Sequence, residues 1–177
     1  MDLSKISAGD NIPDEVNAVI EVPTYGAPVK YEVDHDTGVL KVDRFMGTAM
    51  HYPCNYGFIP HTLAEDGDPL DILVLTHAPL MSGVVIAARP VAVLHMEDES
   101  GGDAKILAVP KDKLTPRYRD VRDYSDLPAA VVEEIAHFFE QYKALEPGKW
   151  ARVDNWHGVD EARREISACV ERYNRSE

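Results

Sequence analysis

An acidic segment with no neighbouring bases is the part of this sequence best suited to chemistry. It holds four carboxylates within seven residues: Glu65, Asp66, Asp68 and Asp71. Residues 45–88 contain no Lys or Arg, whereas acids on a solvated face are normally interspersed with bases. Gly67 permits a tight turn, Pro69 stiffens the backbone, and the apolar residues 70–75 anchor the segment in a core. Carboxylates held this close repel one another, and a hard divalent cation relieves that repulsion with oxygen ligands.

The alternative interpretation is an acidic surface turn, because Asp, Gly and Pro are common turn-forming residues. The missing bases and the third aspartate in register favour a metal site over that alternative. An EF-hand is excluded, since a loop starting at Asp66 would place Asp71 where that motif requires glycine.

A second acidic cluster, which includes Asp98, Glu99 and Asp103, lies at a predicted strand–loop–strand connection. Taken alone it is most simply a polar hairpin tip. Two carboxylate clusters on neighbouring strands, however, are what a site with several metal ions requires, and pairs of ions can clamp the oxygens of a phosphoryl group.

Basic and phenolic residues elsewhere would suit a polyanion, although each also has a simpler structural explanation. Lys30 beside Glu32 fits a solvated cross-strand pair, and Tyr142 falls on an apolar helix stripe. Lys143 and Lys149 near a helix C-terminus would complement the helix dipole. Together, Arg as a bidentate donor, Lys as a point charge and Tyr as a neutral donor would hold phosphate groups. The remaining candidates are Arg44, Tyr52 and Tyr56.

Composition restricts the function classes. The chain has 177 residues, a formal net charge of -13 and 45% hydrophobic residues, enough for one ordinary buried core. A surface this acidic disfavours nucleic-acid and anionic membrane partners. The longest hydrophobic run, residues 84–88, is far short of the roughly 20 residues of a spanning helix. No apolar leader and no cysteine pair motif are found, which together favour a reducing cytoplasm.

The elements that must position these residues form a run of strands followed by a run of helices. We expect a single domain over residues 1–177, strand-rich over 1–115 and helical over 126–175, of the α+β class. One helix is predicted from an N-cap at Asp126 along an apolar stripe to Leu145, and a second over residues 159–173. Residues 46–62 are expected to be ordered but irregular. The predicted strands are 17–22, 29–33, 39–43, 72–76, 84–96 (kinked near Pro90) and 106–109.

The segment DGDPLDI at residues 66–72 resembles the signature of the family I soluble inorganic pyrophosphatases, in their short bacterial form. The resemblance covers nearly the whole chain, although the last 25 or so residues carry no signature. Its further matches are VKYE at 29–32, VDRF at 42–45, YPCNYG at 52–57, the loop 98–105, HFF and YK at 137–143, and GKW at 148–150.

The resemblance implies an OB-like five-stranded closed barrel with two flanking C-terminal helices. It implies a cytoplasmic homohexamer that hydrolyses pyrophosphate to two orthophosphates with several Mg²⁺ ions, for which Mn²⁺ or Zn²⁺ are possible substitutes. Carried onto matching positions, Asp68 resembles the general base. The metal ligands would be Asp66, Asp71, Asp98 and Asp103. The phosphate-binding set would be Lys30, Arg44, Tyr56, Tyr142, Lys143 and Lys149. The supporting polar residues would be Glu21, Glu32, Tyr52, Glu99 and Lys105.

The mechanism we expect is attack by a metal-activated water, with Asp68 accepting its proton and no covalent intermediate. No Walker A motif, G-x-S-x-G motif or cysteine nucleophile motif is present to support covalent chemistry. Three other functions remain open at this point. They are a nucleic-acid or oligosaccharide module, because OB-like barrels often serve that purpose, a metal-dependent phosphatase for organic phosphates, and a structural acidic oligomer.

Overall fold

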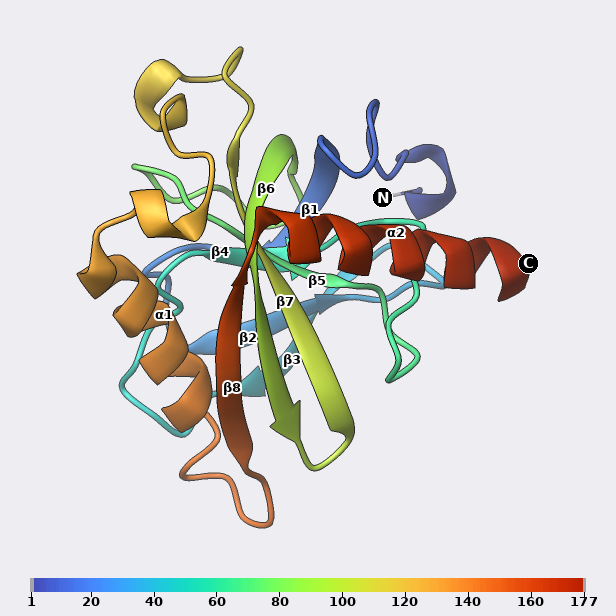
Figure 1. The fold of residues 1–177 in the computed structure, drawn as a ribbon. Coiled ribbons are helices and arrows are strands. Elements are labelled where there is room, and N and C mark those ends of the chain that lie inside the picture. The colour runs from blue at the N-terminus through green and yellow to red at the C-terminus, as the bar shows by residue number, and fades with distance from the viewer. Residues whose placement is uncertain (1, 177) are drawn as a thin grey trace.

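The chain closes five strands into a barrel (Figure 1). The computed structural model describes residues 2–176. Around the ring each strand pairs with two neighbours in the order β1-β4-β5-β7-β6, and β6 pairs with β1 to close it. Every pair is antiparallel except β5 with β7. The five strands are β1 (Val16–Val22), β4 (Asn55–Phe58), β5 (Asp71–Val74), β6 (Val85–Asp98) and β7 (Gly101–Pro110).

The long strand β6 pairs with β7 on one side and with two successive strands on the other. Residues 85–88 pair with β1, and residues 92–98 pair with a further strand, β8 (Ala151–Gly158). The register against β7 shifts between Pro90 and Ala92, where a proline cannot donate to the ladder. This shift lies at the position where the sequence predicts a kink, and it separates the barrel section of β6 from the section that carries β8.

Two helices cover the barrel from different sides (Figure 1). α1 (Ala129–Gln141) buries Ile135, Phe138 and Phe139 against the core cluster that contains Tyr52 and Leu73. α2 (Val159–Ser176) packs on β6 and buries Ala162, Ile166 and Cys169 in a second core cluster. Short 3-10 turns lie at η1 (Leu3–Lys5), η2 (Pro116–Tyr118) and η3 (Tyr124–Asp126).

The predicted limits of the first helix are wrong at both ends. Its N-cap is Pro128, while Asp126 closes the turn η3 in a capping box with Asp123. α1 ends at Gln141, so Leu145, which the apolar stripe included, lies beyond the helix and is exposed. Two strands were also missed: β4 lies within the segment expected to be irregular, and β8 lies within the part expected to be helical.

A separate hairpin, β2 (Val29–Val33) with β3 (Leu40–Phe45), was predicted by its alternation and the turn between the strands. It places Lys30 and Arg44 opposite each other. The predicted fold class, mainly β with an OB-like barrel and two flanking helices, is confirmed.

Candidate active site

A cavity of about 300 Å³ gathers polar residues from almost every strand and from the end of α1. All the predicted site residues line it except Lys149 and Glu99. Lys149 and Glu99 lie beside the cavity. A Glu99 oxygen is 3.3 Å from the ammonium group of Lys143, and the ammonium group of Lys149 is 3.8 Å from Glu99. The lining residues that were not predicted to belong to the site are Val33, His35, Phe58, Pro69, Ser100 and Phe139, of which Pro69, Ser100 and Phe139 lie within the matched motifs.

At the base of the cavity, one buried ammonium group lies between two carboxylates. Lys105 Nζ is 2.5 Å from Asp71 Oδ2 and 2.9 Å from Asp103 Oδ2, and only 3% of the lysine side chain is exposed. Burial alone would lower the pKa of Lys105, but Asp103 and Asp71 outweigh it and raise that pKa well above its usual value. The parallel pairing of β5 with β7 sets this contact, because Asp71 and Lys105 are register partners.

The hydroxyl of Tyr56 donates to both oxygens of Asp71, at 2.9 Å each. Burial raises the pKa of Tyr56 well above its usual value, and it does the same for Tyr52. Both phenols are therefore neutral donors at physiological pH. Tyr142, also buried, reaches the cavity from the residue directly after α1.

The second cluster lies around Lys143, whose ammonium group is 2.6 Å from Asp98 Oδ2. Burial would raise the pKa of Asp98, but hydrogen bonds from Lys143 and from the Ser100 N–H hold it below its usual value. The sequence predicts a loop over residues 97–103 that Asp98 and Asp103 would flank. Both instead lie within strands, in register with Gly101 and Met96 respectively, and only residues 99 and 100 connect β6 to β7.

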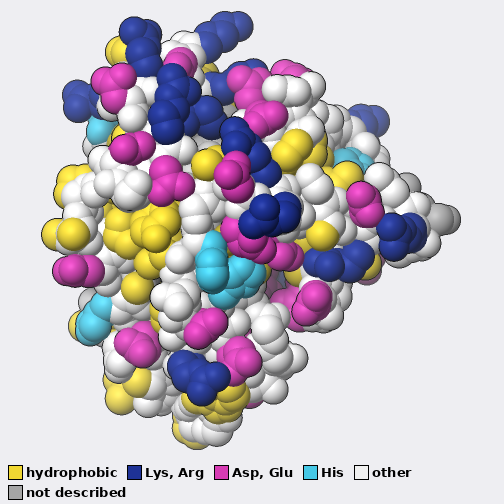
Figure 2. All heavy atoms as spheres, viewed as in Figure 1, with side chains coloured by type: hydrophobic (Ala, Val, Ile, Leu, Met, Phe, Trp, Pro, Cys, Tyr) yellow, Lys and Arg dark blue, Asp and Glu magenta, His cyan; other side chains and the backbone are white. Residues whose placement is uncertain are grey.

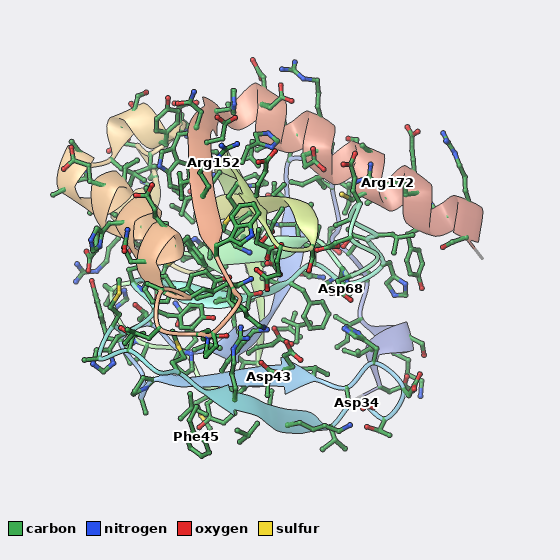
Figure 3. All side chains as sticks on the ribbon, turned by 90° about the horizontal axis from the view of Figure 1, so that it is seen from below. Asp34, Asp43, Phe45, Asp68, Arg152 and Arg172 are labelled. Carbon is green, nitrogen blue, oxygen red and sulfur yellow. The ribbon has the colours of Figure 1, made fainter. Side chains whose placement is uncertain are left out.

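Asp66 and Asp68 come from the loop before β5. Asp66 Oδ1 accepts a hydrogen bond from the Asp68 N–H at 3.0 Å, which fixes a local turn. Burial raises the pKa of Asp66. Within residues 2–176 the Asp68 carboxylate has no hydrogen-bond or ion-pair partner, and Asp68 is exposed at the cavity wall. Figure 3 shows Asp68 between α2 and the β2–β3 hairpin.

The hairpin supplies two cations to the opposite wall. Lys30 forms an ion pair with Glu32 and lies 3.7 Å from Asp43. Arg44 Nη1 is 3.0 Å from Glu146, while its Nε is buried with no hydrogen-bond partner in the described part of the chain. This Nε also lies 3.5 Å from Asp43 Oδ2, a charge contact without hydrogen-bond geometry, so an anion in the cavity would find an N–H that is not yet hydrogen-bonded.

The histidines divide between the cavity and the surface. His35 lines the cavity and contacts the Phe58 ring edge to face, with centroids 5.1 Å apart. His95 and His157 lie on neighbouring strands outside it, with ring centroids 5.0 Å apart. Figure 2 shows histidine side chains next to acidic ones in the middle of the face it displays. No spacing signal in the sequence indicates either placement.

The donor chemistry of the cavity fits a hard divalent cation. Asp66, Asp68, Asp71, Asp98 and Asp103 all line one space, and carboxylate oxygens are the ligands that Mg²⁺ prefers. Among residues 2–176, no three His, Cys, Asp or Glu side chains already stand as a closed metal cage. Instead, Lys105 forms an ion pair with Asp71, and Lys143 forms one with Asp98. A cation binding there would have to displace or rearrange these ammonium contacts.

Glu21 should make stability depend on pH. Burial raises its pKa to about 8, and its Oε1 accepts a hydrogen bond from the Val33 N–H at 2.7 Å. The pKa of a glutamate in an unfolded chain is about 4.3. The folded state therefore binds more protons than the unfolded state between that pH and about 8. Stability therefore falls as the pH rises through this window.

We expect Glu21→Gln to flatten that fall, because glutamine keeps the acceptor for the Val33 N–H without a charge. Unfolding by urea in chelator should give nearly equal stability near pH 4 and a variant more stable at pH 8 by on the order of 4 kcal/mol. The exposed Glu133→Gln variant is the control and should follow the wild type. Identical pH slopes for Glu21→Gln and the wild type would contradict the raised pKa.

The chain resembles known proteins along nearly its whole length. Residues 18–174 match the family model described as inorganic pyrophosphatase. The inorganic pyrophosphatase of Pseudomonas aeruginosa is 59% identical over 170 residues, covering 96% of this chain and 97% of that protein. The solved inorganic pyrophosphatase of Thermus thermophilus superposes with a TM-score of 0.93 at 49% identity, covering 98% of this chain and 99% of that one. That of Coxiella burnetii gives 0.92 at 49% identity, covering 95% and 99%.

Proposed function

The chain belongs to the inorganic pyrophosphatase family and hydrolyses pyrophosphate to two orthophosphates, and we propose that the carboxylate-lined cavity is where this reaction occurs. One observation carries the assignment of the site. Five aspartates from two separate stretches of the chain line the same space as Lys30, Arg44 and Lys143. A small, symmetrical, highly charged anion needs both halves of this arrangement, cations for its oxygens and carboxylates for counter-ions.

The phosphate groups would be held by the basic and phenolic wall. Arg44 offers its Nε, which has no hydrogen-bond partner within residues 2–176, and Lys30 faces Arg44 from the neighbouring strand. Tyr142 would donate as a neutral hydroxyl, Tyr56 would do so only by turning its hydroxyl away from Asp71, and Lys143 approaches from the end of α1. Lys149, which is 39% exposed and does not line the cavity, would reach the substrate from its rim. Fixed cations around the phosphoryl oxygens stabilise the charge that develops on the leaving phosphate.

Asp66, Asp71, Asp98 and Asp103 would hold the divalent cations, most simply Mg²⁺, with Mn²⁺ or Zn²⁺ as substitutes. When bound, such ions neutralise phosphoryl charge and make a nearby water more acidic. The supporting residues would keep these ligands in place: Glu21, Glu32, Tyr52, Glu99 and Lys105. Lys105 already spans Asp71 and Asp103, and Glu99 already lies on Lys143.

Asp68 would act as the general base. Its exposed carboxylate has no partner within residues 2–176, so it can take the proton of the attacking water without first breaking an ion pair. Neither cysteine is placed to act as a nucleophile, because Cys54 and Cys169 are both buried and neither lines the cavity. Burial also raises the pKa of both thiols. The absence of a cysteine nucleophile in the cavity supports the proposal of direct attack by water, without a covalent intermediate.

We also propose that the chain is a single domain that assembles as a homohexamer in the cytoplasm. The hexamer rests on the family resemblance alone, whereas the length of the chain also supports a single domain and its cysteine usage also supports the cytoplasm. Light scattering on the purified protein gives the subunit number directly, and a monomeric mass would contradict the hexamer. Within residues 2–176 the helices are too short or too polar for any of them to cross a membrane.

The decisive assay measures phosphate release from pyrophosphate with Mg²⁺ and with excess chelator. We expect turnover with Mg²⁺, none with chelator, and a kcat/KM for pyrophosphate far above that for ATP. Comparable values for the two substrates would favour the phosphatase of organic phosphates. Absent turnover together with tight single-strand binding in a low-salt gel shift would favour the nucleic-acid module instead.

A further inference from the structure

The C-terminal turns of α2 contact the loop that carries Asp66 and Asp68. Arg172 Nε donates to the carbonyl of Leu63 at 2.9 Å, and the Leu63 N–H donates to the carbonyl of Cys169 at 3.0 Å. His61 Nδ1 lies 3.1 Å from the Tyr173 hydroxyl, and the two rings meet edge to face. Figure 3 shows Arg172 on α2 above the loop that carries Asp68. Both polar groups of the Leu63 backbone are thus bonded to the helix.

A hydrogen bond within the loop links the anchored residue Leu63 to the tip of the loop at Asp68. The Ala64 N–H, directly after the anchored Leu63, donates to the carbonyl of Asp68 at 2.7 Å. On the other side, Leu70 is fully buried and its N–H donates to Thr62 Oγ1 at 2.9 Å. A displacement of Leu63 would therefore move Asp68, whereas Leu70 stays with the core.

Backbone strain indicates that the entry to this loop is imposed by its surroundings. His61 has φ of +54°, in the left-handed region that a residue with a Cβ adopts at a cost in free energy. Such conformations persist where neighbouring contacts hold them, and they concentrate at functional sites. Here the contacts come from Tyr173 and, two residues on, from Arg172.

Arg172 suits this position better than a lysine would. The guanidinium group bonds the Leu63 carbonyl through Nε while Nη2 lies 3.0 Å from Cys169 Sγ and 3.5 Å from Glu165 Oε1. A planar fork can make these contacts at once, and an ammonium group cannot. Residues 45–88 contain no base of their own, so the cation that reaches this acidic loop comes from the far end of the chain.

We infer that Arg172 is a positioning residue: through Leu63 and Ala64 it holds Asp66 and Asp68 toward the cavity. This inference rests on the proposed function, and it assigns a role to the C-terminal helix, whose sequence carries no signature. Arg172 does not touch the substrate cavity, so its loss should impair the orientation of the base more than the binding of pyrophosphate.

The test compares Arg172→Met and Arg172→Lys with the matched control Arg175→Met. Arg175 lies on the same helix and is 75% exposed in a pair with Glu171. Amide hydrogen exchange of the metal-free proteins reads the loop directly. We expect faster exchange over residues 61–68 in Arg172→Met, unchanged exchange in the barrel strands, and wild-type exchange in Arg175→Met.

Kinetics supply the second readout. For Arg172→Met we expect kcat to fall about 10- to 100-fold, with KM for pyrophosphate within about twofold of the wild type. The kcat of Arg172→Lys should lie between those of Arg172→Met and the wild type, and the kcat of Arg175→Met should equal that of the wild type. If Arg172→Met loses protection throughout the barrel, Arg172→Lys decides: reduced kcat with loosening confined to the loop supports the inference, and wild-type kcat overturns it.

The two proposals fail in different ways. A wild-type protein without activity on pyrophosphate would contradict the proposed function. An active wild type whose Arg172→Met variant keeps its kcat and its loop protection would overturn only the positioning role.

Discussion

Asp68→Asn is expected to retain its fold and its affinity for divalent cations while kcat for pyrophosphate falls by about 10²–10⁴-fold. The reason is that the Asp68 carboxylate makes no hydrogen bond or ion pair within residues 2–176, so the amide disturbs no packing or pairing. Asparagine has nearly the same shape but cannot accept the proton of the attacking water. Steady-state phosphate release, with urea unfolding to confirm the fold, measures both halves of this expectation.

The matched control is Asp120→Asn, at an exposed aspartate that does not line the cavity. It removes the same charge and should keep wild-type turnover. Turnover of Asp68→Asn close to that of the control would refute the role of Asp68 as the base. A loss of stability in Asp68→Asn would show that the carboxylate has structural partners.

Lys105→Met should destabilise the metal-free protein by about 3–5 kcal/mol, because it leaves two carboxylates facing each other in a largely buried site. The side chains of Asp71 and Asp103 are 23% and 15% exposed, so water screens their repulsion poorly. Methionine fills nearly the same volume, which leaves charge as the main change. Urea unfolding in excess chelator at pH 7.5 measures the difference in unfolding free energy.

Lys41→Met is the control, since Lys41 pairs with Asp34 at the surface and is 57% exposed. Such a pair contributes about 0–1 kcal/mol. Added Mg²⁺ should recover part of the stability lost in Lys105→Met, because a cation that binds only the folded state stabilises it. Equal stabilities of Lys105→Met and Lys41→Met in chelator would contradict the bridging role of Lys105.

Sequence patterns predicted β1, β2, β3, β5, β6 and β7 and missed β4 and β8. β4 has only four residues, all buried, so no alternation marks it. Its Gly57 lies so close to β1 that a Cβ would stand 1.8 Å from the Val19 carbonyl oxygen, a packing requirement that local sequence does not reveal. β8 pairs with β6 outside the closed ring and alternates between half-buried and exposed residues.

The site was predictable where its residues are close in sequence or match the family motif. The aspartates of residues 66–71 were found from spacing and the missing bases. The contact of Lys105 with Asp71 was not, because it depends on the parallel register of β5 with β7. The anchoring of the loop by Arg172 was hidden for the same reason: it joins segments 109 residues apart.

Isothermal titration of the metal-free protein with MgCl₂ tests the central claim, that the converging aspartates bind divalent cations. We expect saturable binding by the wild type and a large loss of affinity in Asp71→Asn, with turnover of pyrophosphate rising in step with occupancy. Undiminished Mg²⁺ binding by Asp71→Asn, or full turnover in excess chelator, would contradict it.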